Sequence, residues 1–454
     1  MSGREKVPVA AVLAAGLLLA WPAAWNGYPL VFADSGTYLG QAILLYLGWD
    51  RPAFYSLFLH ALHWRVTLWA IPLAQGLMAA HLLALTLRVL DRPGAGPLLL
   101  AAALLAFGTG LPWLVAQVMP DVFTGLLALA LWLIGFGRAR LGRWERVWLV
   151  LLAAGMVAAH LSHLPLTLGL ALVGGALAWL RANAVAGARV AGRMAAPAAL
   201  AVAALVAVNA AGHGRFSVSP FGSVFFAARL IQDGPAVRTL DARCGEVAWR
   251  VCALRQHLPM AANDFLWPPD GPLRGVLGGG KAWATEASAL IAATLAREPG
   301  AVALAVLSNT LRQFPILTSG DGLVPWPGEP GPAPLLAAHF PPREGAAFRA
   351  ARQQAGQLER DVARLVPLHV VLAWVGLVML PWLAWLRRRE TAASALCLLV
   401  LAWGVGNAMV TGGLSSVEPR YQGRIAWLFV FAACATVMSS RMLIRHPVER
   451  RHAA

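Results

Sequence analysis

The chain is dominated by apolar runs that are close to the length needed to cross a bilayer. A membrane-spanning helix needs about 20 consecutive apolar residues, and runs of this kind recur along the 454 residues. Hydrophobic residues make up 59% of the chain and charged residues only 13%. A water-soluble core of this size does not need so much apolar surface. We therefore predict an all-α polytopic membrane protein.

The apolar runs predict a transmembrane bundle of ten spans. They cover about residues 8–25, 66–88, 96–113, 122–137, 147–160, 164–180, 194–211, 367–386, 391–410 and 425–440. With a cytoplasmic N-terminus, every short connection on the cytoplasmic side is basic, as the positive-inside rule requires. The arginines of those connections and of the C-terminal tail are Arg88, Arg92, Arg138, Arg140, Arg143, Arg146, Arg181, Arg189, Arg193, Arg387, Arg388, Arg389, Arg441, Arg445, Arg450 and Arg451.

This topology also explains the net charge of +16. In a soluble protein such a charge indicates nucleic-acid binding, but here the basic residues follow the membrane sides, so we expect a lipid bilayer and no nucleic acid as partner. Both termini are expected in the cytoplasm. The first span, preceded by Arg4 and Lys6, is also typical of a secretory signal. Because Trp21, Pro22 and Trp25 disrupt a small-residue cleavage site, we expect an uncleaved helix.

The spans divide the chain into three parts. Residues 1–212 form an N-terminal transmembrane module with a first outer loop, 213–366 an outer domain, and 367–454 a C-terminal transmembrane module with a basic tail. The outer segment is rich in Gly and Pro but includes a helical stretch interrupted at Pro299, which predicts amphipathic helices near the membrane surface. Cys244 and Cys252 lie in this segment, where an oxidising compartment permits a disulfide; the sequence leaves their pairing open.

Polar side chains gather on the outer side of the predicted topology. A charge near the hydrocarbon boundary is costly unless it meets water, a partner or a substrate, so each is a candidate functional residue. They are Asp34 and Arg51 after the first span, Asp121 at the start of the fourth, His160 and His163 between the fifth and sixth, and Glu418, Arg420 and Tyr421 before the tenth.

Simpler interpretations exist for several of these residues. Asp34 and Asp121 each precede or open a helix, where an aspartate commonly serves as an N-cap. His160 and His163 have an i, i+3 spacing that suits metal ligands, but two histidines without a clear third ligand are weak evidence. A divalent metal therefore stays open. Arg420, with the tyrosine that follows it, suits an interfacial anchor.

Taken in order, the motifs resemble a known group of membrane enzymes. They are FADSGTYL with Asp34, RPAFYSLFLHAL from Arg51, MPDVFTGLLALAL with Asp121, HLSHLPLTL with His163, and PRYQGRIAWLFVF with Arg420. This combination resembles the GT-C superfamily of polytopic glycosyltransferases, which includes protein O-mannosyltransferases and lipid A aminoarabinose transferases. The resemblance covers residues 8–212 and 367–440 and is looser across the outer segment.

Two positions depart from the family pattern. Many members have paired acids after the first span, whereas here Ser35 follows Asp34, which puts a metal site of the DxD kind in doubt. Where many relatives carry a lysine near the fifth or sixth span, this chain has His163, whose charge at neutral pH depends on its surroundings.

The resemblance implies a sugar donor carried on polyprenyl phosphate and an acceptor that is a lipid, a glycan or a protein. Asp34 would be the base that deprotonates the acceptor hydroxyl in an inverting transfer, and Asp121 would orient the acceptor. Arg420 and Arg51 would bind the departing phosphate. The resemblance also implies further substrate contacts by Tyr38, Tyr55, His160, His163, Glu418 and Tyr421. It places the enzyme at the outer face of a bacterial-type inner membrane.

Other functions remain open at this point. A transporter or flippase of lipid-linked glycans would place charges in mid-membrane on broken helices and would show two related halves. A glycan polymerase or ligase would use the same face and similar residues. A non-catalytic assembly protein would tolerate loss of the Asp34 carboxylate.

Overall fold

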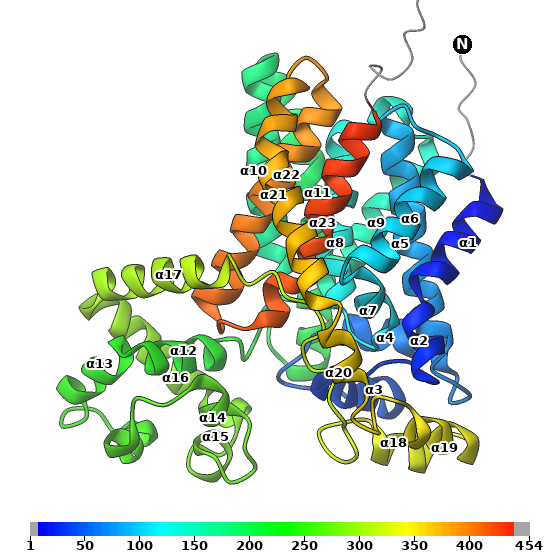
Figure 1. Ribbon diagram of the computed structural model, residues 1–454. Coiled ribbons are helices and arrows are strands. Elements are labelled where there is room, and N and C mark those ends of the chain that lie inside the picture. Colours follow the sequence, from blue (N-terminus) through cyan, green and yellow to red (C-terminus); the bar gives the residue numbers. More distant parts are fainter. Residues whose placement is uncertain (1–7, 440–454) are drawn as a thin grey trace, which may run out of the picture.

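The computed structural model describes residues 8–439, which fold into helices and connecting loops (Figure 1). Within this part of the chain there is no β-sheet, only one isolated bridge between Leu30 and Gln117. The basic residues predicted to mark the two cytoplasmic termini, in residues 1–7 and 440–454, lie outside the described part. The all-helical class predicted from the apolar runs is therefore confirmed for residues 8–439.

Helices stand at all ten predicted span positions, and six of them in residues 8–439 are long and apolar enough to cross a membrane. These six are α5 (Ala70–Val89), α10 (His163–Arg181), α11 (Ala184–His213), α21 (Val366–Leu386), α22 with its π-helical extension (Thr391–Gly413) and α23 (Pro419–Met438). The other four are shorter: α1 (Val9–Leu19), α6 (Ala95–Gly108), α8 (Asp121–Phe136) and α9 (Arg143–Ala159). The prediction of ten full spans stays untested by this arrangement.

Helices α8 and α23 form the centre of the bundle. Every residue of α8 from Asp121 to Gly135 is buried, and α23 is the most buried of the six long helices. A helix that is apolar all round belongs in the interior, which explains the position of α8 among α5, α9, α10, α11, α22 and α23. Both central helices begin at the same end of the bundle (Figure 1).

Helices α10 and α11 form a tight hairpin because small residues face one another. A Cβ atom added to Gly187 would lie 2.9 Å from the carbonyl oxygen of Gly175, a separation that no larger residue allows. The side chain of Asn183 caps the start of α11 by accepting a hydrogen bond from the Ala186 backbone N–H at 2.9 Å. The small residues of α10 and α11 thus allow the two backbones to approach closely, as in other membrane helix pairs.

The first outer connection carries α3 (Ala33–Leu44) and α4 (Ala53–His63), after a short α2 (Trp21–Asn26). The start of α3 is held by Ser35, whose hydroxyl accepts a bond from the Phe32 N–H and donates one to the carbonyl of Val118. Val118 lies between α7 (Leu111–Ala116) and α8. This contact brings the first residues of α3 next to the first residues of α8.

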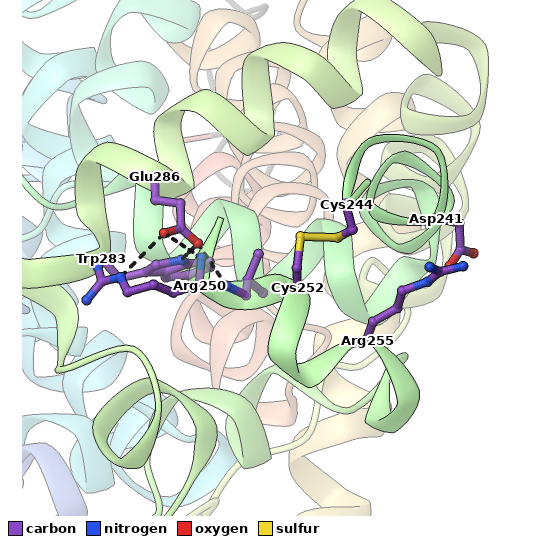
Figure 2. The surroundings of a disulfide bond; sticks show 8 residues. Asp241, Cys244, Arg250, Cys252, Arg255, Trp283 and Glu286 are labelled. Carbon is purple, nitrogen blue, oxygen red and sulfur yellow. Dashed lines mark hydrogen bonds and ion pairs between the residues drawn. A yellow bond between two sulfur atoms is a disulfide. The ribbon is translucent and has the colours of Figure 1, made fainter. Parts of the chain in front are cut away.

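The inserted segment begins with a helical unit that has its own hydrophobic core. Its elements are α12 (Ser223–Asp233), α13 (Pro235–Arg243), the 3-10 helix Arg250–His257, α14 (Ala262–Leu266), α15 (Pro272–Gly275) and α16 (Gly280–Arg297). Figure 2 shows Cys244 and Cys252 joined by a disulfide, so the pairing that the sequence left open is present. Beside it the partly buried Glu286 accepts hydrogen bonds from the Arg250 backbone and the Trp283 indole.

The predicted helix break at Pro299 is confirmed. Helix α17 (Pro299–Gln313) begins there and leaves α16 at an angle of 103°. It runs crosswise to the bundle (Figure 1) and packs against the π-helical turn Met409–Gly413. Leu304, Leu307 and Leu311 remain exposed along it, the pattern of an amphipathic helix that lies on a membrane surface.

The rest of the inserted segment packs against the bundle instead of the outer unit. Helices α18 (Ala333–His339) and α19 (Pro342–Ala350) contribute to the bundle core, and α20 (Leu358–Ala363) leads into α21. Gln353 ties this part to the first outer connection, because its side chain bonds both the N–H and the carbonyl of Val31. Residues 213–366 therefore pack in two groups, one around its own core and one against the bundle. The domain boundaries drawn from the sequence stay a prediction.

Candidate functional site

Asp34 lies where three parts of the chain meet, in the first turn of α3. Its Oδ1 accepts a hydrogen bond from Arg51 Nη2 at 2.8 Å, and its Oδ2 accepts one from Arg420 Nη1 at 3.4 Å. The carboxylate makes no N-cap bond to the backbone. The capping interpretation is therefore wrong for Asp34, since both oxygens face guanidinium groups and the Ser35 hydroxyl bonds the free N–H at the helix start.

Asp121 occupies the matching position at the start of α8. Its Oδ1 accepts a hydrogen bond from Arg424 Nη1 at 3.2 Å, and its Oδ2 lies 3.9 Å from Arg420 Nε. This carboxylate also makes no cap bond. Arg420 thus joins the two acids, and the predicted residues Asp34, Asp121 and Arg420 form one ionic cluster with Arg51 and Arg424.

Burial makes this cluster strongly electrostatic. The side chain of Asp121 is 2% exposed and that of Arg424 is fully enclosed, so solvent screens their charges little. Three guanidinium groups and two carboxylates leave an excess of one positive charge. Asp121 Oδ2 and Arg424 Nε have no hydrogen-bond partner among the described residues. A cluster with surplus positive charge and unused polar atoms is suited to an anionic ligand.

The carboxyl group of Asp34 is kept ionised by its neighbours. Burial by itself would raise its pKa, but the charges of Arg51 and then Arg420, with their hydrogen bonds, outweigh this and lower the pKa below the usual aspartate range. Its side chain is 19% exposed. The carboxylate is therefore charged at neutral pH and still reachable from outside.

Arg424 extends the cluster towards the turn between α9 and α10. Its Nη2 donates to Asn407 Oδ1 at 3.1 Å and to the Ser162 hydroxyl at 3.4 Å. The same hydroxyl lies 2.8 Å from His160 Nδ1. His160, predicted as a substrate contact, is thus connected to the acids through Ser162.

His163 lies one step further from the acids, at the start of α10. Its Nδ1 donates to the carbonyl of Met156 at 2.7 Å, since a carbonyl oxygen can only accept. Its Nε2 lies 2.9 Å from the Thr124 hydroxyl, within hydrogen-bond distance. With both ring nitrogens engaged, His163 has no lone pair for a metal ion. No group of three or more His, Cys, Asp or Glu side chains in residues 8–439 has a metal-binding arrangement.

The predicted tyrosines have different surroundings. Tyr38 and Tyr55 are buried and pack edge to face with ring centres 5.0 Å apart, and the Tyr55 hydroxyl donates to Gln75. Tyr421 lies beside the guanidinium groups of Arg420 and Arg424, 5.4 and 5.5 Å from its ring centre.

Glu418, predicted as a substrate contact, lies apart from the ionic cluster. Its carboxylate accepts hydrogen bonds from Asn263 in α14 and from Ser416, and its backbone is bonded on both sides by the side chain of Gln313. These contacts connect the start of α23 to the outer unit and to α17.

Two hollows reach the cluster from different sides. One, of about 380 Å³, is lined by Arg420, Arg424 and the loop that contains Asp321. The other, of about 470 Å³, is lined by Arg51 together with apolar residues of α11 such as Leu205 and Val208. Helix α11 is the least buried of the six long helices. Phe221 and Phe225 of the outer unit complete the lining of the second hollow, which therefore lies between the first outer connection, α11 and the outer unit.

Arg424, Asn407 and Ser162 are members of the site that sequence reasoning missed. The predicted tenth span begins at residue 425, directly after Arg424, and Arg424 was not among the predicted site residues. The signal was present, because an arginine four residues after Arg420 falls on the same helix face and a charge inside a span is a functional candidate. Asn407 has no comparable signal in a run of apolar residues.

No protein-family model, no curated protein and no solved structure matches the chain. The fold and site by themselves define a class: a helical membrane protein with an ionic cluster at one end of its bundle.

Proposed function

We propose that the chain is a GT-C-like glycosyltransferase that moves a sugar from a polyprenyl-phosphate carrier to an acceptor hydroxyl at the outer face of a bacterial-type inner membrane. The observation that carries the proposal is the convergence of Asp34, Asp121 and Arg420. These residues come from α3, α8 and α23, and Arg420 lies within 4 Å of both acids.

Such a transfer needs an ionised carboxylate next to groups that hold a phosphate. Asp34 removes the proton from the acceptor hydroxyl, whose oxygen then forms a bond to the anomeric carbon of the sugar. The bond from that carbon to the phosphate oxygen breaks, and the lipid phosphate leaves as an anion. Arg51 and Arg420 stabilise this anion through charge-assisted hydrogen bonds.

The ion pairs of Asp34 fit a site that becomes active when the donor binds. Without substrate, Arg51 and Arg420 lower the pKa of the carboxyl group and so weaken it as a base. A donor phosphate competes for the same guanidinium groups. Once Arg51 bonds the phosphate, the pKa of Asp34 rises towards that of a useful base.

The two hollows suit the two substrates. The hollow beside Arg51 has apolar residues of α11 on one side, which suits a carrier whose hydrocarbon chain stays in the bilayer. The hollow beside Arg420 is lined in part by polar loop residues, including Thr318 and Ser319, which suits a hydroxylated acceptor. Asp34 lies between the two guanidinium groups.

The experiment that tests the proposal measures donor cleavage. The full chain in lipid nanodiscs is incubated with polyprenyl-phosphate-linked sugars and candidate acceptors, and the released polyprenyl phosphate is quantified. We expect release that depends on both donor and protein. Movement of uncleaved donor between leaflets of a liposome, without release over a broad panel, would instead support a transporter.

A further inference from the structure

A second basic site lies at the opposite end of α8 from Asp121. Arg138 follows the C-terminal end of α8, Arg146 lies in the first turns of α9, and Arg193 lies on α11. The 16 residues of α8 separate this site from the ionic cluster, which corresponds to about 24 Å at the helical rise. It therefore belongs to the other surface of the membrane.

The three arginines line a hollow of about 410 Å³. Its inner wall is apolar, because Ile134 and Leu149 line it and are buried. A cationic rim above an apolar wall fits a molecule with an anionic head and an apolar body.

The guanidinium groups around this hollow lack acidic partners. No carboxylate in residues 8–439 forms an ion pair with Arg138, Arg146 or Arg193. Glu145, the nearest acid in sequence, bonds Arg88 instead at 2.6 Å. Arg146 and Arg193 donate only to backbone carbonyls.

The surroundings place the hollow at the depth of lipid headgroups. Trp144 and Trp148 on α9 are 77% and 46% exposed, and tryptophans of this kind mark the membrane interface. A phosphodiester at this depth would face the arginines while its acyl chains follow the apolar surfaces of α9 and α11.

We propose that the hollow between α8, α9 and α11 binds the phosphodiester headgroup of an anionic phospholipid. Charge complementarity selects an anionic lipid over a zwitterionic one, and the apolar wall selects a lipid over a soluble phosphate. The proposal does not depend on the transfer reaction, because the two sites are at opposite ends of the bundle.

The test is a lipid titration of the purified full chain in neutral detergent, read by native mass spectrometry. Phosphatidylglycerol is the probe, phosphatidylcholine the neutral comparison and inorganic phosphate the soluble competitor. The variant R138Q/R146Q removes two rim charges. The control R143Q/R389Q removes two exposed arginines that do not line this hollow.

We expect phosphatidylglycerol to bind the wild type and the control alike, and R138Q/R146Q more weakly by about tenfold or more, since each arginine contributes about fivefold near a charged lipid surface. Arg138→Gln alone, which changes only an exposed side chain, serves if the double variant does not fold. Equal phosphatidylglycerol binding by R138Q/R146Q and the control, equal binding of phosphatidylcholine, or displacement by inorganic phosphate would overturn the proposal.

Discussion

Arg51 Nη2 lies 2.8 Å from Asp34 Oδ1, so the two charged residues of the first outer connection form one unit. They are 17 residues apart, and the chain between them forms most of α3 and a turn. Trp267 of the outer unit lies beside the same guanidinium group, 5.4 Å from ring centre to Cζ. The pair thus connects the membrane bundle to the outer unit.

Loss of Arg51 is expected to move the pH dependence of transfer. Arg51 and Arg420 lower the pKa of Asp34, so the carboxylate stays ionised as the pH falls towards the usual aspartate range. The kcat/KM of the wild type should therefore show no loss from Asp34 protonation between pH 7 and 5. In Arg51→Gln the pKa of Asp34 rises. The acid limb of the pH profile, where kcat/KM falls as the pH is lowered, should move to higher pH by about one unit or more.

The matched control is Arg65→Gln, because Arg65 lies in the same outer connection but donates to the carbonyl of Ile43. Its acid limb should match that of the wild type. An unchanged acid limb in Arg51→Gln would refute the electrostatic coupling.

The buried pair of Asp121 and Arg424 should dominate the stability of the site. Removing one partner, as in Arg424→Met, leaves a buried charge and should cost about 3–5 kcal/mol, whereas the double variant D121L/R424M should recover most of that loss. The measurement is unfolding in detergent of both single variants and the double one. The exposed pair of Arg140 and Asp91 is the comparison, where Arg140→Met should cost less than about 1 kcal/mol. A double variant as unstable as the worse single one would contradict the pairing.

A methyl group at Gly423 should disturb the site through packing. A Cβ atom there would overlap the carbonyl oxygen of Thr318, so Gly423→Ala must move α23 or the loop beside it. We expect a loss of about 1–3 kcal/mol and at least tenfold slower transfer, since Arg424 is the next residue. Gly192→Ala, at a position with open space around it, is the control, and equal effects of the two variants would contradict the close approach.

The disulfide should stabilise the outer unit. Cys244 and Cys252 close a short loop with a sequence separation of 8, for which the loop-entropy relation gives about 2–3 kcal/mol. The variant C244A/C252A should lower the melting temperature, and reduction should lower that of the wild type but not that of the variant. Thiol labelling of the unreduced wild type at either cysteine would show that the bond does not form.

Sequence reasoning reached the acids and Arg420 because each stands at the start of a helix on one side of the predicted topology. It could not predict which groups pair. Arg420 and Asp34 are 386 residues apart, and only the packing of α23 against α8 decides that Arg420 lies between two acids. Glu418, two residues earlier, faces the outer unit instead, because it precedes the first turn of α23 and has an extended backbone.

For the fold as well, local patterns were predictable from the sequence and long-range contacts were not. Apolar runs predicted where the bundle helices lie, since burial in a membrane or a bundle leaves a direct hydrophobic signal. The inserted segment has no such signal, so the division between the unit around Trp283 and the part held by Gln353 depends on long-range contacts.

The most direct test of the central claim compares Asp34→Asn with Asp50→Asn in the donor-cleavage assay. Asp50 is next to Arg51 and lines the same hollow, but among residues 8–439 its carboxylate forms no ion pair with the cluster. If Asp34 is the base, Asp34→Asn should reduce transfer by about 10²–10⁴-fold, with the protein still folded, and Asp50→Asn should stay within a few-fold of the wild type. Transfer by Asp34→Asn at the wild-type rate would contradict the account.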